Sequence, residues 1–154
     1  MAVANSYFHV GIVVPDIEAA RGRLSELLGV SWGPLVEIEH AKRDASGNDL
    51  TYPLRVCYSA SEPRLELIEE LPGSVWECNE HSNLHHLGFW SDALAADSDA
   101  LEDAGCPLHL SGRNGDIAPW QSAYHDDPLG IRIELVDTAN LPLLEDHMFK
   151  AVSD

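Results

Sequence analysis

Near its start the chain alternates apolar and polar residues, and after that its apolar residues are spaced as in a helix. Residues 8–14 alternate in a way typical of a β-strand, and apolar residues then recur on one helical face over residues 17–28. Asp16 is suited to cap the start of this helix, and Gly29 stands where a left-handed residue would end it. The pattern therefore predicts a strand, a helix and a stop.

The same order of features returns in the second half. Residues 84–90 predict a strand of the form His-apolar-Gly-apolar, and a second helical pattern begins after Asp92 and ends at Gly105. These two residues are thirteen positions apart, as are the corresponding residues of the first half. The two halves are therefore predicted to be copies of one unit.

The end of each half repeats as well, because residues 64–69 and 132–137 both place a carboxylate among apolar residues. Further strands are expected at 32–39, 54–59, 108–110 and 121–125. Each half thus reads β-α-β-β-β. The predicted fold class is α+β, with the two repeated modules forming a curved mixed sheet.

One domain is expected to span residues 1–154. Its parts are module one at about 5–70, a connector at 71–83, module two at about 84–138 and a C-terminal tail at 139–154. The turn formers and charges of residues 41–51 predict an exposed hairpin loop. The tail is expected to form a short helix that packs Leu143, Leu144 and Met148.

Composition narrows the classes of partner. With 154 residues, 45% of them hydrophobic, the chain can bury a core of its own. A formal charge of −17 disfavours nucleic acid and anionic membrane surfaces. No apolar run is long enough to span a membrane and no signal peptide is evident, so we expect a cytoplasmic protein. The three cysteines, Cys57, Cys78 and Cys106, form no metal or redox motif and are expected to be reduced.

Four polar residues interrupt the predicted apolar strands at matching places. Strand alternation puts His9 on one face with Gly11, and Glu66, His86 and Glu134 occupy equivalent positions in the other strands. A carboxylate buried in a strand is costly unless it is paired or bound to a metal. Imidazole and carboxylate together suit a first-row divalent ion, so these four residues are the predicted metal ligands.

The strings FHVGIVVPDIEAA, LELIE, LHHLGFWSD and DPLGIRIELVD resemble the vicinal-oxygen-chelate superfamily, also called the glyoxalase/bleomycin-resistance/dioxygenase family. The resemblance covers nearly the whole chain and is closest to glyoxalase I and methylmalonyl-CoA epimerase. In those branches one residue from each of four strands holds the metal, at positions that match His9, Glu66, His86 and Glu134. His86 fits better than His85, because it precedes the apolar-Gly-apolar string. Glu66 resembles the bacterial glyoxalase pattern.

The resemblance implies a metal-dependent lyase, isomerase or epimerase that acts through an enolate on a small substrate with two neighbouring oxygens. Glu134 and Glu66 are the expected proton-transfer groups, and the metal could be Ni, Co, Zn, Mn or Fe. Relatives also imply a homodimer. The alternatives are an extradiol-type Fe(II) dioxygenase, which Glu66 disfavours, and a metal-free protein that binds a small molecule, which the intact ligand set disfavours.

Several other residues are candidates for contacting a substrate. Aromatic residues expected in the pocket wall are Trp90, Tyr58, Trp120 and Tyr124, with Trp76 and His125 as further candidates. Arg55 is expected at the surface, although it could also bind an anion. His40 or Glu37 lies where epimerase-like members keep an acid or base.

Overall fold

The structure is a computed structural model that describes residues 6–152. In this part of the chain two compact units form. Unit 1 contains residues 6–8, 39–52 and 86–141, and unit 2 contains residues 9–38, 53–85 and 142–152. None of the described helices is long and apolar enough to cross a membrane.

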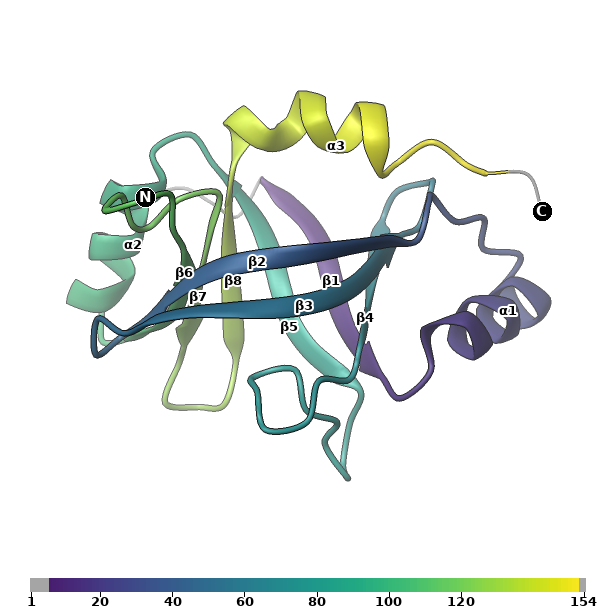
Figure 1. Cartoon of the computed structure of the whole chain (residues 1–154), viewed down its shortest axis with the longest axis horizontal. Coiled ribbons are helices and arrows are strands. Elements are labelled where there is room, and N and C mark those ends of the chain that lie inside the picture. Colours follow the sequence, from purple (N-terminus) through teal and green to yellow (C-terminus); the bar gives the residue numbers. More distant parts are fainter. Residues whose placement is uncertain (1–5, 153–154) are drawn as a thin grey trace. The chain divides into compact units, whose positions relative to one another are not determined.

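The order of elements repeats as predicted (Figure 1). The first half contains β1 (Tyr7–Val14), α1 (Ile17–Leu28), β2 (Val36–Asp44), β3 (Asp49–Tyr58) and β4 (Arg64–Glu69). The second half contains β5 (Leu84–Ser91), α2 (Leu94–Asp103), β6 (Leu108–Gly112), β7 (Ser122–Asp126) and β8 (Arg132–Asp137), followed by the 3-10 turn Thr138–Asn140 and α3 (Leu141–His147). The predicted α+β class with two β-α-β-β-β modules is confirmed.

The strands are hydrogen-bonded in the order β1-β4-β3-β2-β6-β7-β8-β5 within the described residues. The first and last strands of each module run parallel, β1 beside β4 and β5 beside β8, and the pairs β3–β4, β6–β7 and β7–β8 are antiparallel. The sheet is therefore mixed, as the sequence predicted. This parallel pairing places the first and last strands of each module side by side.

Each unit has its own apolar core between its helix and its strands. In unit 2 the cluster under α1 consists of Val14, Ile17, Trp32, Cys57 and Leu67. In unit 1 the cluster under α2 consists of Leu94, Leu101, Cys106, Ala123 and Leu135. Burying an aliphatic side chain of this size contributes about 1.5–3 kcal/mol, so the two clusters fix which face of each sheet the helix covers.

The two helices begin differently. Asp16 accepts a hydrogen bond from the backbone N–H of Ala19, and Gly29 ends α1 at a φ of 68°, as predicted. The prediction for Asp92 is wrong, because the N-cap of α2 is Ala93 and makes no side-chain cap. Asp92 instead accepts a hydrogen bond from the hydroxyl of Thr138.

The predicted loop at 41–51 is also wrong. Strands β2 and β3 extend into it and leave only residues 45–48 as the turn, where Asp44 accepts bonds from the backbone N–H groups of Ser46 and Asn48. The extension occurs because β2 pairs with β6 through Lys42, Arg43 and Asp44. Charged residues that look like a loop in the sequence are strand residues once a partner strand lies alongside.

The tail forms the expected short helix with a different contact. Leu143 is exposed, whereas Phe149, which lies after α3, is buried and packs edge-on against Tyr58 at 5.4 Å between ring centroids. The guanidinium of Arg64 covers the ring of Phe149 at 3.8 Å. Phe149 therefore attaches the tail to unit 2.

Candidate metal centre

His9 and Glu66 form a buried pair in unit 2. They lie on the parallel strands β1 and β4, where Gly11 is the register partner of Glu66. His9 Nε2 is 3.3 Å from Glu66 Oε2, and His9 is 0% exposed. Tyr58, directly opposite Glu66 on β3, donates its hydroxyl hydrogen to the other carboxylate oxygen. The register of three strands thus holds the carboxylate against the imidazole.

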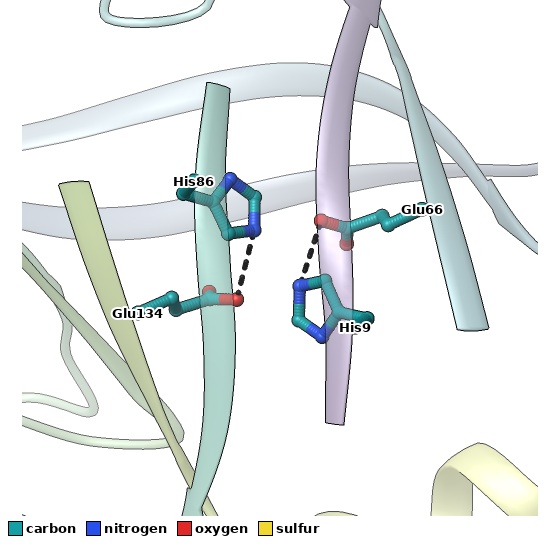
Figure 2. Close-up of side chains that lie close together, drawn as sticks. All are labelled: His9, Glu66, His86 and Glu134. Atoms are coloured by element: carbon teal, nitrogen blue, oxygen red, sulfur yellow. Dashed lines mark ion pairs between the residues drawn. The ribbon is translucent and has the colours of Figure 1, made fainter. Parts of the chain in front are cut away.

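His86 and Glu134 form the equivalent pair in unit 1. Glu134 on β8 lies opposite Gly88 on β5, and His86 Nε2 is 3.3 Å from Glu134 Oε2. Tyr124 on β7 is the register partner of Glu134, and its ring centroid lies 5.0 Å from that of His86. In both units the histidine points at the glutamate (Figure 2). A tyrosine is the register partner of that glutamate in each unit.

The distance within each pair suits two ligands of one ion. Charge-assisted hydrogen bonds between nitrogen and a carboxylate measure about 2.7–2.9 Å, shorter than these pairs. Two donors bound at about 2.1 Å with an angle between about 90° and 109° would be about 3.0–3.4 Å apart. The four side chains are all buried, and their imidazole and carboxylate donors make them candidate metal ligands. The residues present therefore fit a divalent ion.

The neighbouring histidine has a different role. His85 Nε2 lies 2.8 Å from the carbonyl oxygen of Val75, within unit 2. His86 is buried beside Glu134, whereas His85 is half-buried on the other side of the strand. Strand alternation accounts for this, because residues one apart point to opposite faces.

Two of the four aromatic candidates lie beside these pairs. Tyr58 and Tyr124 are buried next to the glutamates, as described above. Trp90 is half-buried and stacks on Phe8 with ring centroids 4.1 Å apart. Trp120 lies in the loop before β7 and is 37% exposed. The structure thus brings the two tyrosines to the His–Glu pairs.

The two further pocket candidates, Trp76 and His125, are buried in the interior of the fold. Trp76 is buried in the connector. His125 is buried against α2, where its ring nitrogens lie 2.9 Å from the hydroxyl of Ser98 and 3.0 Å from the carbonyl oxygen of Cys106. His125 therefore lies on the helix-covered face of β7, opposite to Tyr124.

Arg55 is held by acidic side chains of unit 2. It forms ion pairs with Glu18 at 2.9 Å, Glu37 at 3.2 Å and Glu69 at 2.8 Å. The hydrogen bond from Arg55 holds the pKa of Glu69 below its usual range. Arg55 therefore joins strands and helix, and Glu37, which is largely exposed, belongs to this network.

Sequence reasoning missed two buried residues. Phe149 was not singled out, since nothing in the tail repeats the pattern of the modules. Lys42 was placed in an exposed loop, yet it is buried on β2, two residues after His40. The sequence offers one signal for Lys42, which is that lysine is rare in this chain. Lys42 and Lys150 are its two lysines.

Comparison with known proteins identifies one matching family. The sequence model of the Glyoxalase/Bleomycin resistance protein/Dioxygenase superfamily matches residues 8–124. No curated protein matches the sequence.

Solved structures are similar to this chain in fold. Methylmalonyl-CoA epimerase from Mycobacterium tuberculosis has a TM-score of 0.58 and 21% identity over 89% of this chain and 90% of that one. A variant of Streptomyces coelicolor methylmalonyl-CoA epimerase in complex with 2-nitronate-propionyl-CoA has a TM-score of 0.57 and 19% identity, over 87% of this chain and 97% of that one. A hypothetical protein from Bacillus halodurans has a TM-score of 0.53 and 15% identity, over 86% and 93%. At these identities the likeness concerns the fold alone.

Proposed function

Because the chain belongs to the Glyoxalase/Bleomycin resistance protein/Dioxygenase superfamily, we propose that it is a metal-dependent lyase, isomerase or epimerase. Its substrate is a small molecule with two neighbouring oxygens, and its reaction proceeds through an enolate. The observation that carries the proposal is the pair of buried His–Glu contacts, each with a tyrosine opposite the glutamate, at equivalent places in the two repeats.

In this proposal His9, Glu66, His86 and Glu134 are the ligands of one divalent ion. Equivalent residues of a repeat are the natural sources of a shared site, and the donor set suits Ni, Co, Zn, Mn or Fe. When bound, such an ion supplies Lewis acidity that stabilises negative charge developing on a substrate oxygen. An experimental structure in which the ring nitrogens of His9 and His86 are more than about 7 Å apart, within a chain and within any dimer, would contradict one shared ion.

The side chains of the site have separate tasks. Glu66 and Glu134 are the carboxylates available to remove and return a proton at the carbon between the substrate oxygens. Tyr58 fixes the orientation of Glu66 by donating its hydroxyl hydrogen to it. Both pairs are buried, and exclusion of water strengthens the electrostatic interactions of a bound substrate.

The proposal predicts proton transfer without a change of oxidation state. If His9, Glu66, His86 and Glu134 held a six-coordinate ion, two positions would remain for a substrate with two oxygens and none for dioxygen. Fold alone does not decide between the chemistries of a superfamily, so the reaction itself has to be measured.

The test begins with metal analysis of protein purified without added metal. The loaded protein is then screened against adducts of 2-oxoaldehydes with thiols, epimers of acyl-CoA esters, and catechols. We expect activity that survives exclusion of oxygen, with Zn, Ni or Co, and incorporation of solvent deuterium at the carbon beside the chelating oxygens. Oxygen consumption with a catechol, dependent on Fe(II), would instead identify a dioxygenase.

A further inference from the structure

Phe149, in the C-terminal tail, packs against the tyrosine that contacts Glu66. Phe149 is buried, and its ring centroid lies 5.4 Å from that of Tyr58 with the ring planes at 79°. The same tyrosine ring lies 5.5 Å from the imidazole of His9 and donates its hydroxyl hydrogen to Glu66 Oε1. One side chain, that of Tyr58, therefore connects the tail to both members of the His9–Glu66 pair.

Arg64 holds the Phe149 ring on the face of β4 that carries Glu66. Arg64 lies two residues before Glu66 on this strand, so the two side chains leave the same face. Its guanidinium lies 3.8 Å from the centroid of the Phe149 ring and donates a hydrogen bond of 2.9 Å to the carbonyl oxygen of Ser59. A cation above an aromatic ring is attracted to the electron-rich ring face. Arg64 and Tyr58 thus fix the position of Phe149 together.

The backbone of the tail is bound to the same segment as the backbone of Tyr58. The N–H of Val152 donates to the carbonyl of Trp32 at 3.1 Å, and the N–H of Gly33 donates to the carbonyl of Tyr58 at 2.9 Å. A Cβ atom on Gly33 would overlap the carbonyl oxygen of Met148, so the tail passes directly against this glycine. The tail therefore contacts Tyr58 through its ring and is linked to its backbone by way of Trp32 and Gly33.

We propose that Phe149 is a positioning residue of the candidate metal centre and acts through Tyr58 on Glu66. The inference rests on the proposed function and deepens it, because it makes the C-terminal tail part of the site. The hydrogen bond from Tyr58 goes to one oxygen of Glu66 and turns the other, Oε2, toward His9, whose Nε2 is 3.3 Å away. A partner that orients a ligand in this way changes metal affinity by about 10- to 100-fold.

The contact between Phe149 and Tyr58 is tested on the metal-free protein. Labelling with 3-fluorotyrosine gives one fluorine-19 signal from each of the four tyrosines, and Tyr58→Phe identifies the signal of Tyr58. Phe149→Leu keeps an apolar side chain but removes the ring, so it should shift the Tyr58 signal and leave that of the exposed Tyr7 in place. An unmoved Tyr58 signal would overturn the inference.

Zinc affinity, measured by competition with a chelator, tests the effect on the site. Phe149→Leu should weaken zinc binding about 3- to 10-fold, less than the loss of a direct partner of the ligand. Phe149→Tyr keeps the ring and should stay close to the parent, as should Leu143→Ala, a substitution at an exposed position of the tail. If Phe149→Leu does not fold, Phe149→Met takes its place. A folded variant without the ring that binds zinc as tightly as the parent would show that Phe149 has no such role.

The route through Tyr58 is tested by combining two substitutions. If Phe149 acts by holding the Tyr58 hydroxyl on Glu66, Phe149→Leu should weaken zinc binding in the parent and have no further effect in Tyr58→Phe, where the hydroxyl is already absent. A general contribution of the tail to the fold would lower zinc affinity by the same factor in both backgrounds. Equal factors would therefore refute the positioning role.

Failure of the proposed function would look different. A parent protein that binds neither zinc nor another first-row ion would refute the metal proposal and the positioning role with it. A parent that binds zinc, together with equal factors in the two backgrounds, would refute the role of Phe149 alone. The metal content of the parent thus separates the two failures.

Discussion

Tyr58 donates its hydroxyl hydrogen to Glu66, the residue directly opposite it in the sheet. Tyr124 stands in the same relation of register to Glu134 in the other unit. The repeat therefore extends beyond the four predicted ligands to the tyrosine facing each carboxylate.

Removal of the Tyr58 hydroxyl should destabilise the protein. A hydrogen bond to a charged acceptor contributes about 1.5–3 kcal/mol, so Tyr58→Phe is expected to lower the free energy of unfolding by that amount in urea. Tyr7→Phe is the control, because Tyr7 is exposed and its edge contact with Phe89 needs only the ring. Equal stability of the two variants would mean that the Tyr58 bond contributes nothing.

Substitution of each predicted ligand should empty the metal site. His9→Ala, Glu66→Ala, His86→Ala and Glu134→Ala are each expected to lower bound metal well below one ion per chain, measured by elemental analysis after gel filtration. Circular dichroism should remain close to that of the parent.

His85→Ala is the matched control for these ligand variants. His85 is adjacent to His86 but contacts the carbonyl of Val75, so its substitution should leave the metal content near that of the parent. Loss of metal in His85→Ala but not in His86→Ala would show that the wrong histidine of the pair has been assigned.

The Arg55–Glu69 contact should make stability depend on pH. Because the hydrogen bond from Arg55 lowers the pKa of Glu69 in the folded protein, this carboxylate stabilises the fold above its unfolded pKa of about 4.3. That contribution is lost as the pH falls through the lower folded pKa. The difference in unfolding free energy between the parent and Glu69→Gln should therefore be largest at neutral pH and shrink below about pH 4. A difference that grew on acidification would refute this.

Two glycines of unit 2 should respond in opposite ways to alanine. A Cβ atom on Gly33 would lie 1.8 Å from the carbonyl oxygen of Met148, whereas one on Gly22, in α1, would meet nothing within 4 Å. Gly33→Ala should therefore displace the tail and cost about 1–3 kcal/mol in urea denaturation. Gly22→Ala should stabilise the helix by about 0.5–1 kcal/mol. Equal effects of the two substitutions would show that the tail at Met148 can move away from residue 33 without a loss of stability.

The sequence by itself determined the order of elements and the faces of the strands. Local patterns suffice for this, because a period of two and a period of 3.6 are properties of the backbone. The apolar-Gly-apolar string that follows both His9 and His86 separated His86 from His85. The repeat also gave each half one histidine and one carboxylate, and these form the contacts His9–Glu66 and His86–Glu134.

Only the tertiary structure decided the surroundings of Lys42, Asp92 and Phe149. Lys42 looks like a loop residue among turn formers and becomes a buried strand residue because β6 lies beside β2. Asp92 looks like a helix cap and instead accepts a bond from Thr138, 46 positions later. Phe149 lies outside the repeat and is buried by Tyr58 and Arg64. In each case the deciding partner is remote in sequence, so no local pattern contains it.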